Sequence, residues 1–308
     1  MTRYRNALLF LTLAALWGSA FMAIKAGLDY FPPVLFAAIR YDVAGLIMLV
    51  YAGWVTDQLW PTTRAGWAQV VVGGALMIGS YHAFLFVGEL QTTSAAAAVI
   101  VSLSPILTTG FARALLPDER LTATGIAGTV LGLVGVGILA RPDPANLLTA
   151  DVIAKGLVFV AALSFALGSV LTRRIDADLP IETMEAWSML GGAALMHAVS
   201  VALPSESPGA IRWTPEALAA LGYLSIAASA VGFLIYFDLL DRLGPVEINL
   251  VSYVAPVFAA VSGYLVLGEI IDGYTVAGFL VIVVGFVLLK REALAAELPK
   301  LRAALARE

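Results

Sequence analysis

The sequence predicts an all-α integral membrane protein of ten transmembrane helices, arranged as two inverted five-helix repeats. Composition is the first observation: 60% of the 308 residues are hydrophobic and only 13% are charged. Soluble globular chains carry about 25% charged and about 45–50% apolar residues. The second observation is a set of motifs that recurs at an offset of 150 or 151 residues. One core cannot bury this much apolar surface, so lipid is the expected solvent.

Ten apolar segments are long enough to cross a bilayer. A helix needs about 20 residues to span about 30 Å of hydrocarbon. Breaks rich in proline and charge separate the segments, for example at 31–33, 116–119 and 141–144. The first segment is too long for a signal peptide, so we expect it to be a retained helix. The predicted spans are residues 7–28, 34–55, 65–88, 92–115, 122–140, 154–173, 182–203, 215–240, 246–267 and 273–290.

Lysine and arginine are unevenly distributed between the two sides that these spans define. With the N-terminus inside, 13 basic residues fall on the cytoplasmic side and 5 on the outer side. Cytoplasmic loops carry such an excess, so both termini are predicted to be cytoplasmic. The tail over 292–308 is expected to form an amphipathic helix at the membrane surface or in water. The five outer residues are Lys25, Arg40, Arg141, Lys155 and Arg212.

The two halves of the chain carry the same residues in the same order. The first half contains Ser104, Pro105, Glu119, Gly128 and Gly135, and the second contains Ala255, Pro256, Glu269, Gly278 and Gly285. Each half therefore holds five helices, over 1–145 and 146–291. Because five is odd, the second repeat enters the membrane from the opposite side. Many secondary transporters share this inverted-repeat architecture.

Several of these motifs resemble a known family. Leu16-Trp-Gly-Ser-Ala-Phe21, Ile39-Arg-Tyr41 and the two series above are similar to the EamA-type members of the drug/metabolite transporter superfamily. The resemblance covers nearly the whole chain. It implies a substrate cavity lined by helices 1, 3, 4, 6, 8 and 9, and export of amino acids, metabolites or drugs from a bacterial cell. It also implies that helices 5 and 10 pack at the periphery and can support dimers.

His82, beside Tyr81 on the third predicted helix, is the histidine nearer the middle of the bilayer. Histidine titrates near neutral pH, and an ionisable group inside a membrane commonly marks a functional site. We expect Tyr81 and His82 to contact substrate or to carry a coupling proton. The alternative is a neutral, hydrogen-bonded core imidazole.

Arg40 and Asp42 lie about two turns into the second predicted helix. Residues two apart on a helix do not face each other, so each needs a partner elsewhere. Arg40 is expected to meet a substrate carboxylate or Glu89, and Lys25 to pair with Asp29 or Asp42. A structural ion pair near the outer interface is the alternative for this region.

Further candidate cavity residues lie on helices one, four and nine. Aromatic rings can line an amphipathic cavity, and hydroxyl and amide groups can orient a ligand. The candidates are Trp17, Ser102, Asn249, Ser252 and Tyr253.

Pro105 and Pro256 are expected in the middle of helices four and nine. Proline removes a backbone donor and kinks a helix, so these residues are candidates for shaping or gating the cavity. A tolerated kink, common in membrane helices, is the alternative. The glycines of helices five and ten favour close packing. Glu119 and Glu269 are expected to cap helices or anchor loops.

These features predict a secondary transporter of the bacterial inner membrane that exports a small organic solute by alternating access. An amino acid is the first choice, slightly favouring aromatic ones, and a drug or toxic compound is the alternative. The expected partners are the solute, lipid and protons as a coupling ion, with the chain as monomer or homodimer. No cofactor or catalytic residue is expected. No metal site is expected, since cysteines are absent and histidines number two, and the net charge of −4 does not favour a nucleic-acid partner. An intramembrane enzyme and a non-transporting scaffold are the rival classes.

Overall fold

The computed structural model describes residues 2–116, 123–141, 148–243, 248, 250–289 and 291. Seven of the described helices are long and apolar enough to cross a membrane: Arg5–Gly27, Pro33–Val55, Arg64–Glu89, Ser94–Leu115, Ala123–Ala140, Ala150–Arg174 and Pro215–Leu240. Two shorter apolar helices, Val251–Leu267 and Gly273–Leu289, and the helix Ile181–Ala202 complete the ten spans. The predicted fold class is confirmed.

Several spans consist of more than one segment. The first repeat contains α1 (Thr2–Gly27), α2 (Pro33–Val55), α3 (Arg64–Val72) with η1 (Gly73–Ser80) and α4 (Tyr81–Glu89), α5 (Ser94–Val101) with α6 (Ser104–Leu115), and α7 (Ala123–Ala140). The second contains α8 (Ala150–Arg174), α9 (Ile181–Ala202), α10 (Pro215–Gly222) with η4 (Tyr223–Val231) and α11 (Gly232–Leu243), α13 (Val251–Leu267) and α14 (Gly273–Leu289). Short 3₁₀ turns, Pro204–Glu206 and Pro208–Ala210, follow α9.

The third and eighth spans each contain a π-helical segment at the equivalent place. The segment η1 begins at Gly73 and η4 begins at Tyr223, 150 residues later. The same spans begin with equivalent caps, because Thr63 and Thr214 each accept a hydrogen bond from the backbone N–H three residues ahead. Since π-helical segments are rare, the internal repeat extends to the hydrogen bonding of the backbone.

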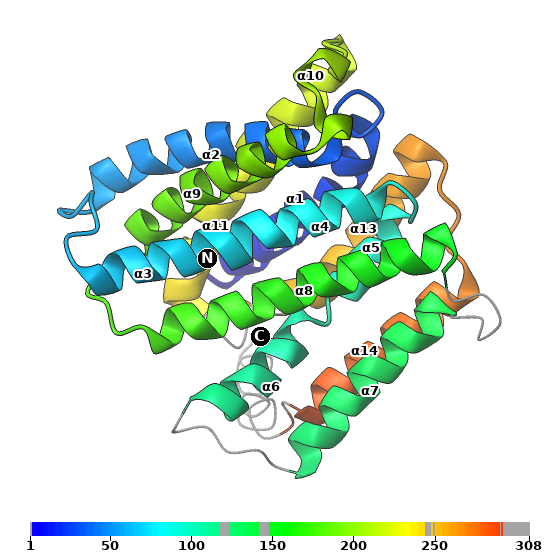
Figure 1. Cartoon of the computed structure of the whole chain (residues 1–308). Helices are drawn as coiled ribbons and strands as arrows, with labels where there is room; N and C mark the ends of the chain where they lie inside the picture. The colour runs from blue at the N-terminus through cyan, green and yellow to red at the C-terminus, as the bar shows by residue number, and fades with distance from the viewer. Residues whose placement is uncertain are drawn as a thin grey trace.

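Glycines hold the last helix of each repeat together. In Figure 1, α7 and α14 lie side by side at the lower edge of the bundle. A Cβ on Gly128 would lie 2.6 Å from the carbonyl oxygen of Gly285, and one on Gly278 would lie 2.6 Å from that of Gly135. Gly128 corresponds to Gly278, and Gly135 to Gly285. These reciprocal contacts are those of a pseudo-two-fold axis, and the glycines pack the two repeats against each other.

The first helix of each repeat packs mainly into the other half of the chain. α1 lies against α13, α10, η4 and α11, while α8 lies against α4, η1, α5 and α6. Small residues permit both approaches: a Cβ on Gly168 of α8 would lie 2.7 Å from the Met77 side chain of η1. Gly18 of α1 faces the Ala255 carbonyl of α13. The two halves therefore interlock.

The structure corrects the expected position of Pro105. The fourth span is broken at Ser102 and Leu103, so Pro105 is the second residue of α6 and not the middle of a continuous helix. Proline suits this first turn because the N–H it lacks has no helical partner there. Pro256 does lie inside its helix, α13, and is buried. The tail 292–308, Glu119 and Asn249, for which expectations are given above, lie outside the described residues.

Candidate functional site

Arg40 is the centre of a polar cluster inside the bundle. Its side chain is only 6% exposed although it lies in the membrane-spanning helix α2. The Nε and Nη2 groups donate to the hydroxyl of Ser229 in η4, at 3.2 and 3.1 Å. Its Cζ also lies 5.0 Å from the ring centre of Tyr41. Among the described residues Arg40 makes no ion pair, so neither Glu89 nor another such carboxylate neutralises it directly.

His82 is tied to both neighbouring elements by its two ring nitrogens. The Tyr41 hydroxyl lies 2.7 Å from Nε2, and the Ile78 carbonyl lies 2.9 Å from Nδ1. A carbonyl can only accept, so Nδ1 carries hydrogen, and in a neutral imidazole Nε2 accepts from the tyrosine hydroxyl. A neutral imidazole can therefore make both bonds. It matches the expected alternative of a hydrogen-bonded core histidine, and it leaves no ring nitrogen free.

Aromatic rings surround this cluster. The Tyr81 ring lies 4.4 Å from that of His82, edge to face, and 5.4 Å from that of Phe165 in α8. Trp17 of α1 donates its indole N–H to the Ala228 carbonyl, 3.1 Å away and next to the serine that binds Arg40. Its ring lies 5.5 Å from Tyr236. Arg40, Tyr81, His82 and Trp17 are therefore grouped around η1, η4 and the helices beside them.

The other predicted site residues are not part of this group. Ser102 is buried and donates to the Val99 carbonyl of its own helix. Ser252 and Tyr253 lie in the first turn of α13. The Tyr253 ring packs at a tilt against Phe286 of α14, at 4.4 Å between centres. A cavity-lining role for these three residues stays a prediction.

Asp42 and Lys25 have different partners in the structure from those expected. Asp42 pairs with His197 of α9 at 2.7 Å, joining the second and seventh spans. The Lys25 ammonium group donates instead to the carbonyl oxygens of Glu89 and Leu90, at 2.6 and 3.1 Å. It thereby holds the turn that follows α4 against the end of α1.

Two buried carboxyl groups are more prominent in the structure than the sequence suggests. Glu89, the last residue of α4, is completely buried. Glu185 of α9 is 7% exposed and lies near enough to interact electrostatically with Tyr41 and Tyr236. The sequence does give one signal for these two residues: each is an acidic residue within or at the end of an apolar span. Burying a charged side chain in a membrane is energetically costly, so such residues commonly have a function.

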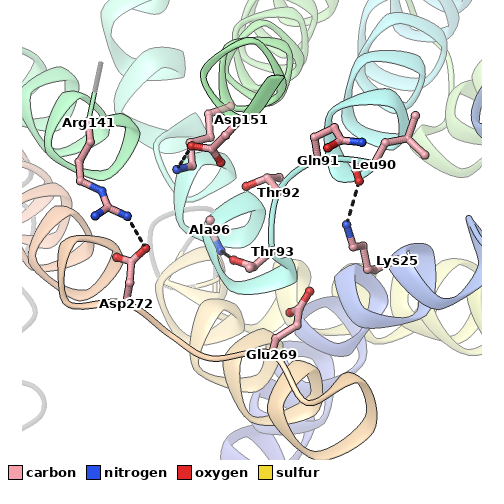
Figure 2. A pocket seen from close by; sticks show the side chains of 11 residues that line it. Lys25, Leu90, Gln91, Thr92, Thr93, Ala96, Arg141, Asp151, Glu269 and Asp272 are labelled. Carbon is pink, nitrogen blue, oxygen red and sulfur yellow. Dashed lines mark hydrogen bonds and ion pairs between the residues drawn. The ribbon is translucent and has the colours of Figure 1, made fainter. Parts of the chain in front are cut away.

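A cavity of about 460 Å³ opens at the end of the bundle where α1 finishes. Figure 2 shows its wall, with Thr92 in the turn between α4 and α5 and Glu269 from the loop after α13. Ion pairs close two of its sides, Arg141 with Asp272 at 3.0 Å and Lys155 with Asp151 at 2.8 Å. The cavity is polar and of a size that suits a small solute.

Glu269 joins the two repeats at this cavity. Its carboxylate accepts from the backbone N–H of Ser94, at 3.0 and 3.2 Å, and so caps the N-terminus of α5. Gly263 leaves room for it, since a Cβ there would lie 2.5 Å from Oε2. The expected capping role is therefore present, but the capped helix belongs to the other repeat.

Asp272 is held as a carboxylate beside Glu269. Burial alone would raise the pKa of Asp272, but hydrogen bonds from the Thr275 and Tyr274 backbone, and the Arg141 guanidinium, together hold that pKa below its ordinary value. The Thr275 N–H donates to Oδ1 at 2.7 Å, so Asp272 also caps α14. This group therefore supplies a fixed negative charge at the mouth of the cavity.

Ten spans in two inverted halves, with a buried guanidinium between them and a polar cavity at one end, are the features of a membrane transporter. Two copies of the EamA-like transporter family pattern match the chain, over residues 5–141 and 153–291. The chain belongs to this family.

Similar proteins extend over nearly the same length. The "uncharacterized inner membrane transporter YedA" of Escherichia coli is 30% identical, over 87% of this chain and 86% of its own. The "uncharacterized transporter YvbV" of Bacillus subtilis is 26% identical, over 94% and 92%. One solved crystal structure has a TM-score of 0.64 at 25% identity, covering 94% of this chain and 99% of its own.

Proposed function

We propose that this protein exports a small organic solute bearing a carboxylate, across the bacterial inner membrane. An amino acid is the favoured class, with aromatic ones first. The two repeats rock against each other around the Arg40 cluster, which becomes open to each side in turn. Both termini are cytoplasmic in this proposal, following the distribution of basic residues, and the cavity at the end of α1 faces outward. The name of the Escherichia coli relative supports the choice of membrane.

The observation that carries this proposal is the guanidinium of Arg40, which is buried and forms no ion pair within the described ranges. A buried charge is costly unless it is paired and hydrogen-bonded. Arg40 has the Ser229 hydroxyl and a tyrosine ring, but no ion-pair partner among the described residues. A substrate carboxylate would supply the missing charge, and a planar guanidinium can bind one through two parallel hydrogen bonds.

Aromatic groups beside Arg40 support the preference for aromatic solutes. Trp17, Phe233 and Tyr236 form one cluster of rings, with centres 5.5 to 6.3 Å apart. Trp17 is fixed by its bond to Ala228, next to the arginine's partner Ser229. Such rings offer an apolar surface for a flat side chain while Arg40 holds the carboxylate.

The test is solute flux in proteoliposomes loaded with labelled L-phenylalanine. The expected result is efflux by the native protein, which Arg40→Gln lowers about tenfold or more, as loss of a charge-assisted pair should. Arg40→Lys should retain part of it. The control is Arg64→Gln, at the exposed start of α3. Absence of flux for every amino acid tried, or equal flux in Arg40→Gln, would overturn the proposal.

A further inference from the structure

In the part of the chain that the structure describes, the Glu89 carboxylate has no hydrogen-bond donor. The residue is 0% exposed, and neither Oε1 nor Oε2 has a hydrogen-bond partner among the described residues. The interior of a membrane protein offers no bulk water in place of those bonds. A buried polar group without a partner is rare in native structures and requires an explanation. The two groups that would satisfy this carboxylate are a cationic ligand and a proton.

The position of Glu89 places it near Arg40. His82, Phe86 and Glu89 follow one another at intervals of four and three residues, so they share one face of α4. The Phe86 ring centre lies 6.0 Å from the Arg40 Cζ. Glu89 is thus about one helical turn beyond a ring that lies near the guanidinium, and it interacts electrostatically with Arg40. The Glu89 carboxyl group and the Arg40 guanidinium therefore lie on the same side of the third span.

Charged groups from three neighbouring elements face Glu89. They are Lys25 of α1, Arg40 of α2 and Glu269 of the loop after α13. Lys25 donates its hydrogen bonds to the backbone carbonyls of Glu89 and Leu90. The Glu269 carboxylate accepts from the Ser94 N–H. α8 also packs on α4, at Gly88, but its Lys155 is paired with Asp151. None of these described charged groups therefore bonds directly to the Glu89 carboxylate.

The outer cavity lies next to this carboxylate. Leu90 and Gln91, which follow Glu89 directly, line the cavity, and Lys25 forms part of its wall (Figure 2). The peptide carbonyl of Glu89 is already bound to that lysine. A shift of this short turn would expose the carboxylate to the water of the cavity. Along the chain, Glu89 thus lies between Phe86, whose ring is near Arg40, and the cavity-lining Leu90.

We propose that Glu89 binds the ammonium group of a zwitterionic amino acid and, once that substrate has left, a proton. The inference rests on the proposed function, since Arg40 holds the substrate carboxylate at the same time. One carboxylate cannot hold both cations, so the protein exchanges substrate for a proton. The proton comes from water in the cavity, forms an O–H bond on Glu89, and returns to water on the other side. Both ring nitrogens of His82 are hydrogen-bonded, so the proposal assigns the coupling proton to Glu89 instead.

Three ligands separate the roles of the two residues. L-Phenylalanine carries both charges, 3-phenylpropionate lacks the ammonium group, and phenethylamine lacks the carboxylate. In calorimetric titrations of the purified protein, Glu89→Gln should weaken phenylalanine binding about tenfold, the scale of one charged contact. Binding of 3-phenylpropionate should change less than about twofold. Arg40→Gln should weaken phenylalanine and 3-phenylpropionate, but not phenethylamine.

Glu206 provides the matched control. It is also buried, at 3% exposure, but its carboxylate accepts from the Leu35 N–H at 2.9 Å. Glu206→Gln should leave the ligand pattern and proton exchange as they are in the native protein.

Proton exchange is measured in liposomes containing a pH-sensitive dye. Efflux of phenylalanine should acidify the lumen with the native protein. Glu89→Gln should abolish acidification while phenylalanine-for-phenylalanine exchange continues. Acidification by Glu89→Gln, or native efflux without acidification, would overturn this inference and leave the proposed function standing. A native protein that moves none of the amino acids would overturn the proposed function first.

Discussion

Gly128 of α7 lies so close to Gly285 of α14 that the Cα of one faces the carbonyl oxygen of the other. The equivalent residues Gly135 and Gly278 repeat this contact with the roles of the two repeats exchanged. These reciprocal contacts leave no room for a side chain at any of the four glycine positions. Gly137, on the same helix as Gly128, is exposed, and a Cβ added to it would meet no atom within 4 Å.

Replacing Gly128 by valine should therefore destabilise the protein. The new side chain would collide with backbone, and overpacking of this kind costs about 1–3 kcal/mol. Thermal unfolding in detergent, followed by tryptophan fluorescence, measures the effect as a lower midpoint. Gly137→Val is the control and should change the midpoint little. Equal midpoints for the two variants would contradict the close contact between α7 and α14.

The Tyr41 hydroxyl should be needed for stability around His82. Tyr41→Phe removes the donor 2.7 Å from Nε2 and leaves a buried ring nitrogen without a partner. An unsatisfied buried polar group costs about 1–3 kcal/mol. Thermal unfolding measures the loss. Tyr274→Phe is the control, since that tyrosine is 52% exposed and its ring contact with Arg141 would remain. A midpoint for Tyr41→Phe no lower than for the control would argue against this bond.

Asp272 should make stability depend on pH in the acid range. Its folded pKa lies below the ordinary value of 3.8, so ionisation favours the folded state. This contribution is fully present above pH 3.8 and disappears as pH falls through the lower folded pKa. At 42% exposure solvent screens the effect, and we expect at most about 1 kcal/mol.

Unfolding midpoints between about pH 7 and about pH 3 measure this contribution. Asp272→Asn should lower the midpoint at neutral pH, and the difference from the native protein should shrink as the medium becomes acidic. Asp57→Asn, at an exposed loop position, should show no such convergence. A constant difference at every pH would exclude ionisation of Asp272 as the cause.

Glu269 should control the local stability of α5. Glu269→Ala removes the acceptor for the Ser94 N–H, and loss of a helix cap costs about 0.5–2 kcal/mol. Faster hydrogen exchange in peptides covering 94–101, measured by mass spectrometry, is the expected result. Glu216→Ala, in the exposed first turn of α10, serves as the control. Unchanged exchange over 94–101 would show that Glu269 does not hold α5.

Much of the fold follows from patterns that act within one segment. Length and hydropathy locate the spans, and the odd number of helices per repeat sets their inversion. The break in the fourth span is not predictable in this way because Ser102 and Leu103 are compatible with a continuous helix. Pro105 signals an irregularity in the fourth span. A proline, however, is equally compatible with a kink inside one helix and with the first turn of a new helix. For the π-helical segments, we find no comparable local residue signal in the sequence.

The site is less accessible to sequence reasoning because its contacts join distant residues. Arg40 and Ser229, which hydrogen-bond, are 189 positions apart, and Trp17 and Ala228 are 211 apart. Residue type identifies Arg40, Tyr81 and His82 as unusual inside a span. Whether an arginine is paired depends on which helices meet, which periodicity does not specify. For the same reason, only the structure shows that no described residue donates a hydrogen bond to the Glu89 carboxylate.

The interlocking of the first helices restricts the order in which the chain can mature. α1 leaves the ribosome first, yet the surfaces that cover it, from α10 to α13, are encoded about 200 residues later. Until then Arg40 lacks Ser229, and the indole of Trp17 lacks its acceptor. During synthesis, the first repeat must therefore reside in the bilayer while these polar groups lack their hydrogen-bond partners. Truncation after α7 should yield an inserted but unassembled species, one that membrane quality control would recognise and remove.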